Sequence, residues 1–571
     1  MEKKRHIKYN TEVTGAEAVI LSLLDANVTE IFGYPGGAIM PIYDALYDYM
    51  DKLNHYLVRH EQGATHAAQG YSRVSGKPGV VFATSGPGAT NLITGIADAQ
   101  IDSTPLVCIT GQVHSHLLGT DAFQETDVVG VSMPVTKWNI QVTKPEDIAP
   151  AITKAFYIAT SGRPGPVLVD ITKDAQFGKT TYDYKKCESI RSYFPCPKVN
   201  LEDVNAAAEL INKAQRPYIL CGHGVLLSSA EKQLLALAEK ADIPVASTLL
   251  GLSAFPPSHP LYVGYLGMHG NYGPNLLTNE CDVLIAIGMR FDDRVTGNVS
   301  KYAKQAKVVH FEIDPAEINK IIPADVAVLG DAKEALELLL PKVNSAKRKD
   351  WLQKFTDCSN VEFEKVIRDA IDPDSEKLRM AEVIDKFHKI SGGNAIIVTD
   401  VGQHQMITSR YYKFNHPNHS VTSGGLGTMG FGLPAAIGAK VAKPNEQVVA
   451  VLGDGGFQMT IQELGTIMQS NIAVKILVLN NNFLGMVRQW QQLFFDRRYS
   501  FTEMKNPDFI TIAKGYNIKG KKVTERENLQ DALQEMYNSK EAFLLEVVVE
   551  NEENVFPMIT TGASVSEIIL E

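Results

Sequence analysis

Two apolar segments of the sequence end on polar residues of the kind that bind magnesium and phosphate. The run "VVAVLGDGG" ends on Asp454 between glycines, and the run "VKILVLNNN" ends on Asn480, Asn481 and Asn482. One carboxylate and one amide oxygen are too few for a calcium cage, but they suit Mg²⁺, which completes its octahedron with water and phosphate oxygens. Either motif alone is weak, because Gly-Asp-Gly also forms tight turns and asparagine runs also form loops. The pair, each entered by an apolar run, predicts a site for a metal and a diphosphate.

The glycines around Asp454 suit an anion as well as a metal. Gly453, Gly455 and Gly456 have no side chain, so backbone N–H groups can approach a phosphate closely there. A helix is expected to follow, and the N-terminus of a helix favours an anion. In doubly wound sheets, ligands bind beyond the carboxyl ends of the strands, which is where both polar clusters fall.

A further candidate is Glu61, in the segment "YLVRHEQGATHAA". The segment has the pattern of a strand up to Arg59 and of a helix after Glu61. An acidic residue in a first helical turn commonly does no more than stabilise the helix dipole. From the residues alone this structural interpretation is favoured, and the alternative is a catalytic carboxyl group.

The elements that must position these residues are short apolar runs that alternate with helical patterns. Such alternation predicts βαβ units and doubly wound sheets, so the fold class is α/β. The runs expected to form buried parallel strands are "GVVFATSG", "TPLVCITG", "GPVLVDITK", "RPYILCGHG", "DVLIAIGMR", "KVVHFEID", "AIIVTDVG", "QVVAVLGDGG" and "KILVLNNN".

Two breaks interrupt this alternation and divide the chain. Residues 178–200 are polar, aperiodic and proline-bearing, and residues 343–378 are charged, so both are interpreted as linkers. The expected domains are residues 1–178, 196–343 and 378–571, each a doubly wound parallel-sheet α/β domain. The alternative, a single domain with long loops, is disfavoured because loops of that length are uncommon inside a compact domain.

Composition narrows the class of protein. The chain has 571 residues, of which 44% are hydrophobic and 21% charged, and its net charge of −10 argues against nucleic acid or an anionic membrane as partner. The six cysteines form no CxxC pair and are expected to be reduced and mostly buried. The start "MEKKRHIKYNTEVTGAEAVI" resembles no targeting segment, and no apolar window is long enough to span a membrane. A cytoplasmic enzyme is therefore expected.

The middle third carries glycine-rich turns that could hold a nucleotide. "GHGV" and "GMHGNYGPN" are such turns, while "IGMRFDD" and "EIDPAEI" each follow an expected strand. A glycine-rich turn after a strand, with an acidic residue further on, is typical of nucleotide binding. The GxGxxG fingerprint is incomplete here, so this local signal is weak.

The GDG motif followed by NN resembles the thiamin diphosphate motif, and the likeness extends along nearly the whole chain. The sequence closely resembles the acetohydroxyacid synthase (acetolactate synthase) catalytic large subunit family of thiamin-diphosphate-dependent enzymes. The segments that carry the resemblance are "FGYPGGA", "RHEQGATHAAQGYSR", "TSGPGATNLITGIADA", "GTDAFQE", "SGRPGPVLVD", "RFDDRVTG", "VGQHQM", "GGLGTMGFGLPAAIGA" and "GDGGFQM". So many segments in order make the match highly specific.

The resemblance implies a fold and a reaction. The three domains become a pyrimidine-binding, a central FAD-associated and a diphosphate-binding domain. The reaction is that of a transferase, which decarboxylates pyruvate and ligates the hydroxyethyl group to a second 2-oxo acid. With pyruvate the product is 2-acetolactate, and with 2-oxobutyrate it is 2-aceto-2-hydroxybutyrate, which lead to valine, leucine and isoleucine.

The same resemblance assigns residues to the thiamin diphosphate site. Mg²⁺ is expected to bind Asp454, the side chain of Asn481 and the backbone carbonyl of Phe483, and Met429 is expected to wedge under the cofactor. Glu61 is expected to exchange a proton with the aminopyrimidine ring, which reverses the structural interpretation given above. The full expected cofactor set is Pro35, Glu61, Gln403, His404, Gly427, Met429, Gly453, Asp454, Gly455, Gly456, Asn481, Phe483, Leu484, Gly485 and Met486.

Further residues are expected at the reacting centre and around the substrate. Catalytic positions beside Glu61 are Gly37, Gln124 and Lys173. Around the acceptor, the expected residues are Asp293, Arg294, Met486 and Trp490, with Arg294 on its carboxylate and the last two on its alkyl group. Without the resemblance, Arg294 would be interpreted as a surface salt bridge to Asp292 or Asp293, and Trp490 as core packing.

By resemblance the nucleotide of the middle domain is FAD. No redox step is needed for the ligation, so a non-redox role is expected. The expected contacts are Arg163, Gly222, Gly224, Met268, His269, Gly288, Arg290, Asp292, Glu312, Ile313, Asp314, Gly330 and Asp331.

The resemblance also implies partners and leaves alternatives open. The active sites would lie between chains of a homodimer or homotetramer, and a separate small regulatory subunit is expected. His114 stands where the family usually has proline, which bears on inhibitor sensitivity, and Phe483 replaces a commoner polar residue. The alternatives are another FAD and thiamin diphosphate enzyme, such as pyruvate oxidase, or a catalytically silent relative that only binds.

Overall fold

The computed structural model describes residues 9–571, which form two compact units. Residues 1–8, part of the start for which the sequence predicts no targeting segment, lie outside this range. The first unit contains the chain up to Phe194 together with Gly425–Asn445 and Met459–Val474, and the second contains Pro195–Gly424, Glu446–Gln458 and Lys475–Glu571. Each unit is described by itself.

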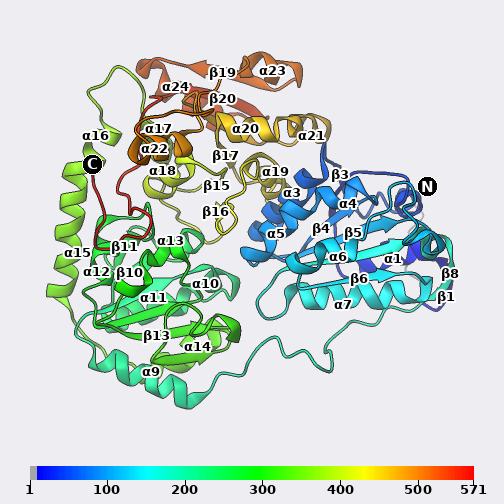
Figure 1. The fold of residues 1–571 in the computed structure, drawn as a ribbon, viewed down its shortest axis with the longest axis horizontal. Helices are drawn as coiled ribbons and strands as arrows, with labels where there is room; N and C mark the ends of the chain where they lie inside the picture. Colours follow the sequence, from blue (N-terminus) through cyan, green and yellow to red (C-terminus); the bar gives the residue numbers. More distant parts are fainter. Residues whose placement is uncertain (1–8) are drawn as a thin grey trace. The chain divides into compact units, whose positions relative to one another are not determined.

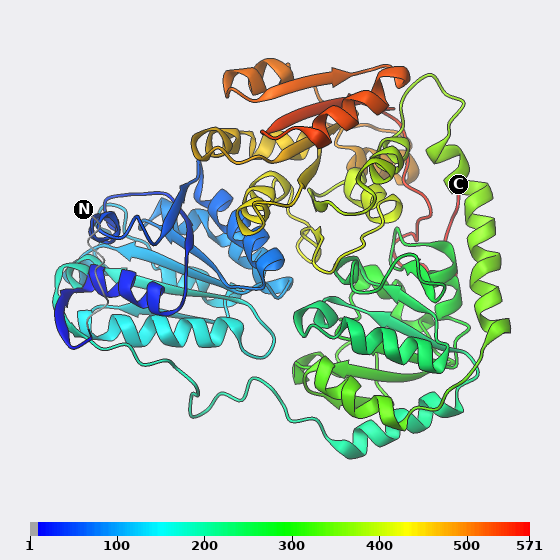
Figure 2. The same ribbon diagram turned by 180° about the vertical axis from the view of Figure 1, so that it is seen from behind.

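The first unit is built on a six-stranded parallel sheet with helices on both faces (Figures 1 and 2). In spatial order its strands are β3 (Asn54–Leu57), β2 (Glu30–Gly33), β4 (Gly79–Ala83), β5 (Leu106–Gln112), β7 (Pro166–Thr172) and β6 (Trp138–Val142). A two-stranded antiparallel ribbon pairs β1 (Thr11–Thr14) with β8 (Lys179–Tyr182). The helices are α1 (Gly15–Asp25), α2 (Met40–Tyr47), α3 (Glu61–Ser75), α4 (Pro87–Asn91), α5 (Ile93–Ile101), α6 (Val128–Ser132), α7 (Ile148–Thr160), α8 (Lys173–Phe177), α19 (Gly432–Ala442) and α21 (Leu464–Ser470).

The strands of this sheet are buried on both faces because their side chains alternate between two apolar clusters. On β4, Val80 and Phe82 pack in the cluster that includes residues of α1 and α7. Val81 and Ala83 pack in the opposite cluster, with residues of α3 and α5. Burial on both faces explains why β4, β5 and β7 appear in the sequence as continuous apolar runs.

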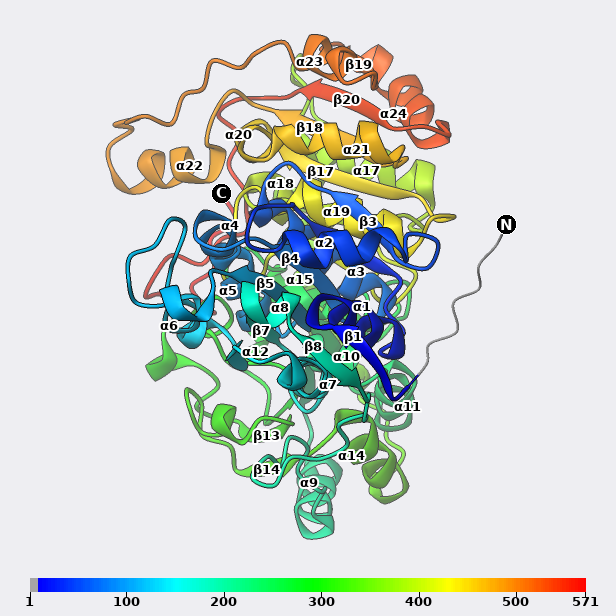
Figure 3. The same cartoon turned by 90° about the vertical axis from the view of Figure 1, so that its right-hand side faces the viewer.

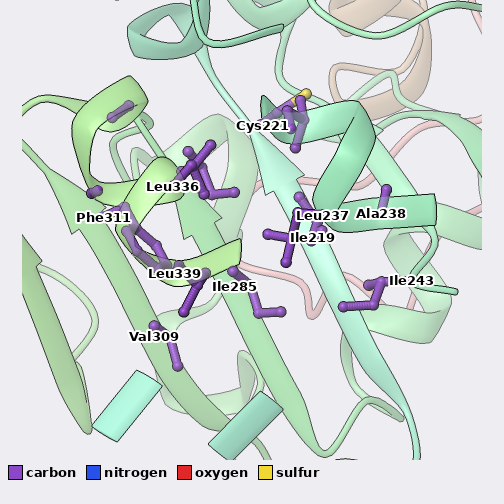
Figure 4. Close-up of a cluster of buried hydrophobic side chains, with 14 of the residues drawn as sticks. Ile219, Cys221, Leu237, Ala238, Ile243, Ile285, Val309, Phe311, Leu336 and Leu339 are labelled. Carbon is purple, nitrogen blue, oxygen red and sulfur yellow. The ribbon is translucent and has the colours of Figure 1, made fainter. Parts of the chain in front are cut away.

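The second unit contains a central six-stranded parallel sheet whose strand order is the one typical of dinucleotide-binding folds. In spatial order its strands are β11 (Tyr262–Tyr265), β10 (Val245–Ser247), β9 (Pro217–Cys221), β12 (Val283–Ile287), β13 (Lys307–Glu312) and β14 (Val326–Leu329). Its helices are α9 (Leu201–Lys213), α10 (His223–Leu227), α11 (Glu231–Ala241), α12 (Tyr272–Thr278), α13 (Asp293–Thr296) and α14 (Ala332–Leu339). Figure 4 shows one buried face of this sheet, where Ile285 and Phe311 pack with Leu237 of α11 and Leu336 of α14.

The third sheet, also in the second unit, repeats the strand order of the first. In spatial order its strands are β16 (Ser420–Val421), β15 (Ile396–Thr399), β17 (Val448–Gly453), β18 (Lys475–Asn480), β20 (Phe543–Val548) and β19 (Lys519–Val523), all parallel. The associated helices are α17 (Met380–Ser391), α18 (Gln403–Tyr411), α20 (Asp454–Met459), α22 (Gly485–Phe494), α23 (Phe509–Gly515) and α24 (Leu529–Asn538). Three parallel sheets flanked by helices confirm the predicted fold class.

The two segments interpreted as linkers differ in structure. Between β8 and α9 the chain has only an isolated bridge, from Ile190 to Tyr193. The segment 343–378 instead contains α15 (Lys349–Glu362) and α16 (Arg368–Ile371). Helix α15 buries Trp351, Phe355 and Cys358 along one side, which packs on the central sheet. Because the helix also carries many charged residues, its composition does not reveal this apolar stripe, and the sequence predicts the segment to be a linker.

The state of the cysteines and the absence of a membrane span, both expected from composition, can be compared with the structure of residues 9–571. All six cysteines are free, and Cys108, Cys221, Cys281 and Cys358 are buried, while Cys187 is half-buried and Cys196 exposed. Across residues 9–571, no helix has both the length and the apolar character needed to cross a membrane.

Candidate active site

The two polar strand ends predicted to bind a metal lie side by side at the carboxyl edge of the third sheet. Strands β17 and β18 are neighbours, and Gly453 is in register with Leu479, so Asp454 and Asn480 leave the sheet at adjacent points. The Asp454 side chain is 1% exposed. This burial raises the pKa of Asp454 to about 6. Hydrogen bonds from Asn506 and from the backbone of Gly455 act in the opposite direction, because they favour the ionised form.

Asn481 has an orientation that suits a metal ligand. Its Nδ2 donates to Gln403 Oε1 at 3.3 Å, and its Oδ1 accepts from the backbone N–H of Phe483 at 3.2 Å. The amide nitrogen is therefore engaged, which leaves the second lone pair of Oδ1 as the available donor to a cation. Among residues 9–571, no group of three or more His, Cys, Asp or Glu side chains could hold a metal. A metal here would depend on one carboxylate plus amide, carbonyl and ligand oxygens.

Gln403 and His404 lie at the topological switch point of the same sheet, at the start of α18 after β15. Gln403 Nε2 donates to Gln489 Oε1 at 3.0 Å and to the carbonyl of Glu553 at 2.8 Å. His404 is buried, its Nε2 has no hydrogen-bond partner, and burial lowers its pKa to about 3, so the ring is neutral. An unpartnered buried nitrogen at a switch point is a feature expected of a ligand site.

The glycines of this region have a packing role that the sequence did not reveal. A Cβ on Gly453 would lie 2.8 Å from His404 Nδ1, and one on Gly456 would lie 2.2 Å from Asp400 Oδ2. A Cβ on Gly485 would lie 2.2 Å from Gln403 Oε1. These glycines let the loops pack directly on polar side chains, in addition to any approach to an anion.

Met486 and Trp490 lie on α22, within an excursion of the chain that leaves the sheet after β18 and returns before α23 (Figure 3). Met486 packs against the core of the third sheet. Trp490 is half-buried with its ring 5.0 Å from that of Phe494, so it is not a core residue. The base of the excursion is closed by backbone hydrogen bonds from Leu484 to Thr502 and from Met504 to Asn482.

In the first unit, Glu61 is directed toward the loop that follows β4. It begins α3, whose N-cap is the side chain of His60. Glu61 Oε2 accepts a hydrogen bond from Asn91 Nδ2 at 2.9 Å, and a Cβ on Gly88 would lie 3.3 Å from Glu61 Oε1. The loop after β4 lies at the switch point between β2 and β4, which is where doubly wound sheets bind ligands.

Three other expected residues lie at the same edge of the first sheet. Gly37, in the loop after β2, has no atom within 4 Å of where a Cβ would be. Gln124 has a positive φ of 61°, and its carbonyl oxygen would be 2.8 Å from a Cβ on Gly86, in the loop after β4. Pro35 is exposed beside Gly37. These residues follow different strands, since Pro35 and Gly37 follow β2, Glu61 follows β3 and Gln124 follows β5. Glu61 and Gln124 both approach the segment after β4, whereas Lys173 follows β7, farther along the sheet.

Gly427 and Met429 belong to the first unit, although they are distant from Glu61 in sequence. The Thr428 hydroxyl donates to Asp98 Oδ1 at 2.9 Å, and the Gly425 N–H donates to Asp102 Oδ1 at 2.7 Å, so α5 holds this loop. The following helix α19 packs closely on α3. Within one chain, the segment with Met429 is therefore anchored to the elements that carry Glu61.

Glu463 is a residue that the sequence analysis missed. It is fully buried, and its Oε1 accepts from the Arg59 N–H at 3.0 Å while its Oε2 accepts from the Thr466 hydroxyl at 2.6 Å. Burial raises its pKa, and hydrogen bonds from Thr466 and from the backbone of Arg59 and His60 oppose this. The carboxylate fixes the backbone just before Glu61. No short motif marks it, because Arg59, whose backbone it binds, lies far away in sequence.

The glycines expected at FAD mark the switch point of the central sheet, between β9 and β12. The Gly224 N–H donates to the Gly288 carbonyl at 2.9 Å, and a Cβ on Gly222 would lie 2.3 Å from that oxygen. Gly288 has a φ of +57°. His269 Nδ1 is buried without a partner, and burial lowers the pKa of His269 to about 4.

The acidic residues expected at FAD hold local turns. Asp292, Asp314 and Asp331 each accept backbone N–H groups as N-caps of α13, of a 3₁₀ turn and of α14, respectively. Glu312 Oε1 accepts from the N–H groups of Ile313 and Asp314 at 2.9 and 3.1 Å. Asp292, Asp314 and Asp331 lie beyond the carboxyl ends of strands of the central sheet, and Glu312 is the last residue of β13. Met268, Arg290 and Gly330 also lie beyond strand ends. Arg163 belongs to the first unit, where its Nε donates to Ser103 Oγ at 2.9 Å.

Arg294 and Asp293 follow β12, and both are exposed. Arg294 Nη1 lies 3.7 Å from Asp293 Oδ2, and the side chains are 61% and 79% exposed. This geometry is consistent with both interpretations of the pair: a surface salt bridge, and an aspartate that orients a substrate-binding arginine. The Arg294 carbonyl accepts from the Met268 N–H at 2.8 Å, which joins the loops after β11 and β12.

Comparisons with known proteins agree with this geometry. Residues 13–131, 204–339 and 400–547 match the N-terminal TPP binding, central and C-terminal TPP binding domains of thiamine pyrophosphate enzymes. The acetolactate synthase large subunit of Buchnera aphidicola subsp. Acyrthosiphon pisum is 44% identical, over 98% of both chains. Acetolactate synthase isozyme 2 large subunit of Escherichia coli is 45% identical over 98% of this chain and 99% of its own. A probable acetolactate synthase large subunit of Methanocaldococcus jannaschii is 45% identical over 97% and 95%. With polar strand ends at the expected edges and matches along nearly its whole length, the chain belongs to the acetolactate synthase large-subunit family of thiamine pyrophosphate enzymes.

Proposed function

We propose that this chain is the catalytic large subunit of an acetolactate synthase. It would decarboxylate pyruvate and ligate the hydroxyethyl group to a second 2-oxo acid, in the synthesis of branched-chain amino acids. The observation that carries this proposal is the meeting of Asp454 and Asn481 at adjacent strand ends in a chain similar to acetolactate synthase large subunits over nearly its full length.

The residues present fit a metal–diphosphate at the third sheet. Asp454 is a buried carboxylate, and within the described chain no Lys or Arg side chain pairs with it. Together with Asn481 and the carbonyl of Phe483 it offers the oxygen donors that Mg²⁺ prefers. Gln403, His404 and the glycines at 453, 455 and 456 would hold the diphosphate, with Leu484, Gly485 and Met486 beside it.

Thiamin diphosphate, when bound, supplies the carbanion chemistry of decarboxylation and ligation. The part of Glu61 is to hold a proton and share it with the aminopyrimidine nitrogen N1′. Its hydrogen bond from Asn91 and the backbone contacts of Glu463 support this role, because both keep the carboxyl group in place. Gly427 and Met429 would contact the same ring, and Pro35, Gly37, Gln124 and Lys173 would line the reacting centre.

FAD is proposed as a second cofactor with a non-redox role. The glycine pair at the switch point of the central sheet and the unpartnered His269 nitrogen support a nucleotide there. The proposed contacts are those predicted from the sequence, Arg163 included.

Arg294, oriented by Asp293, would bind the acceptor carboxylate, while Met486 and Trp490 would contact its alkyl group.

The proposed assembly is a homodimer or homotetramer, with active sites between chains, in the cytoplasm. The relatives are named large subunits, which implies a smaller partner, and we propose that it is regulatory. The domain bounds predicted from the sequence, 1–178, 196–343 and 378–571, are proposed for the three sheets with their helices.

Product analysis tests the proposed function. The full chain is incubated with pyruvate, thiamin diphosphate, Mg²⁺ and FAD, and the products are separated and identified. Acetolactate is expected. Acetaldehyde alone would indicate a simple decarboxylase, acetyl phosphate would indicate a pyruvate oxidase, and no product would indicate a silent relative. Incubation with pyruvate without oxygen should leave the flavin oxidised, whereas a redox-active flavin would be bleached.

A further inference from the structure

Asn506 lies between the two strand ends that carry the proposed metal ligands. Its Nδ2 is 2.6 Å from Asp454 Oδ2, 2.9 Å from Asn480 Oδ1 and 3.1 Å from Asn482 Oδ1. One amide group therefore contacts the residue that follows β17 and also the residues on both sides of Asn481.

A neighbouring glutamine fixes which end of this amide faces the site. Gln458 Nε2 donates to Asn506 Oδ1 at 2.8 Å, and it also lies 3.3 Å from the Asp454 carbonyl. Because the Asn506 oxygen accepts there, the Asn506 nitrogen must face the three oxygens. A flipped amide would place oxygen against the Asp454 carboxylate and would lose every one of these contacts.

The backbone on each side of Asn506 is fixed as well. Before it, the Met504 N–H donates to the Asn482 carbonyl at 2.9 Å. After it, Pro507 restricts Asn506 to extended conformations. Phe509 then packs against Phe457 of α20 with 5.3 Å between ring centroids, and both rings are fully buried. The position of Asn506 is thus set by the same elements that begin at Asp454 and at the end of β18.

These contacts restrict the proposed ligands. With Oδ2 engaged by Asn506, the Asp454 carboxylate cannot rotate freely. Asn480 is also held by its Nδ2, which donates to Glu546 Oε1 at 2.8 Å, and Asn482 has a left-handed φ of 55°. Asn481 lies between these two anchored residues, so the direction of its side chain is fixed through its neighbours.

We propose that Asn506 is a positioning residue for the metal site, which orients Asp454 and the Asn480–Asn482 turn so that their oxygens are set for Mg²⁺ in advance. The inference rests on the proposed function, because it assumes that Mg²⁺ binds at Asp454 and Asn481. Partners that orient metal ligands in this way typically contribute about 10–100-fold to metal affinity.

The test measures Mg²⁺ affinity by calorimetric titration of MgCl₂ into the full chain at saturating thiamin diphosphate. Asn506→Leu removes the donor at nearly constant size. Gln458→Leu, which removes the residue that orients Asn506 and keeps the Asn506 amide, provides a second variant should Asn506→Leu fail to fold. Asp508→Ala is the matched control, because Asp508, two residues away, is exposed and bonds only within α23 as its N-cap. Asp454→Asn reports on the metal site itself.

The expected result is a loss of Mg²⁺ affinity of about tenfold or more in Asn506→Leu and a smaller loss in Gln458→Leu. FAD content and melting temperature should stay close to the parent values, and kcat should recover at saturating Mg²⁺. The inference is overturned if Asn506→Leu binds Mg²⁺ within twofold of the parent while Asp454→Asn does not bind it, and the proposed function then stands. It is also overturned if Asp508→Ala loses as much affinity as Asn506→Leu. If Asp454→Asn keeps parental Mg²⁺ affinity, the proposed metal site fails and the inference fails with it.

Discussion

Glu61 and Asn91 are joined by a 2.9 Å hydrogen bond between the first turn of α3 and the last residue of α4. The bond directs the carboxyl group of the half-buried Glu61 toward α4, which follows β4. An acid that served only the helix dipole would need no such partner, because the dipole acts on any carboxylate in the first turn. The contact therefore supports a chemical role for Glu61.

Replacing Glu61 with glutamine should keep the shape of the site and remove the proton. We expect kcat for acetolactate formation to fall about 10²-fold or more, while thiamin diphosphate still binds. Steady-state kinetics and a calorimetric titration of the cofactor measure the two effects separately. Glu12→Gln is a control of the same chemistry, since Glu12 forms an exposed ion pair with Lys179 in the same unit. Turnover within a few-fold of the parent in Glu61→Gln would refute the assigned role.

Trp490 should influence the choice of acceptor. The Trp490→Leu variant loses a large apolar surface, and one methylene in an apolar pocket is worth about 10–200-fold in selectivity. We expect the ratio of 2-aceto-2-hydroxybutyrate to 2-acetolactate, formed from mixed pyruvate and 2-oxobutyrate, to fall by about tenfold. Phe501→Leu is the control on the same excursion, because Phe501 is 99% exposed. An unchanged ratio in Trp490→Leu would return Trp490 to a packing role.

His66 should make the protein sensitive to acid. The ring is fully buried on α3, and burial, with the charge of Arg73, lowers the pKa of His66 from 6.5 to about 3. A histidine whose pKa is lowered on folding stabilises the fold fully above pH 6.5, and this contribution is lost as the pH falls. Between pH 6.5 and 5 the loss is about 2 kcal/mol.

The urea midpoint of unfolding at pH 7.5 and pH 5 checks this prediction. The parent should lose more stability on acidification than His66→Gln, which keeps a hydrogen-bonding side chain and cannot be charged. The exposed His116 provides the matched variant His116→Gln. Equal acid sensitivity in all three proteins would show that His66 does not carry the effect.

Close packing of α3 and α19 should depend on glycine. A Cβ on Gly438 would lie 1.7 Å from the carbonyl oxygen of Ala67, and one on Gly70 would lie 1.9 Å from that of Ala435. Gly438→Ala should therefore lower the melting temperature, with a cost of about 1–3 kcal/mol or more, because the helices must move apart. Gly515→Ala, at the end of α23 with nothing within 4 Å of the added Cβ, should be nearly neutral. Similar melting temperatures for both variants would contradict this account.

The sequence predicts most interior strands, because burial on both faces leaves a continuous apolar run, but it does not name the interior strands β2, β10 and β20. The nine runs named in the sequence correspond to β4, β5, β7, β9, β12, β13, β15, β17 and β18. Edge strands do not have this signature. β6 (Trp138–Val142) has mostly half-buried residues, and β19 (Lys519–Val523) carries three lysines at the edge of its sheet. Charged residues on such edges are common, because they prevent unwanted strand pairing.

The sequence predicts a site residue only where that residue directly follows a recognisable apolar run or belongs to a short motif. Asp454 and Asn481 follow apolar runs directly, so their meeting could be inferred from the geometry of parallel strands. Asn506 and Glu463 could not be found in this way. Each acts on a residue that is remote in sequence, and the contact exists only because the chain returns to the same place.

The excursion that carries α22 is fastened at its base by the hydrogen bonds from Leu484 to Thr502 and from Met504 to Asn482. Exposed residues between these two hydrogen bonds, such as Val487 and Phe495, can be exchanged without shifting the register of β17 and β18. The buried Arg488 and Gln489 cannot, because they hold the carbonyl of Glu553 and the side chain of Gln403. Variation at these exposed positions would therefore leave the adjacent strand ends that carry Asp454 and Asn481 in place.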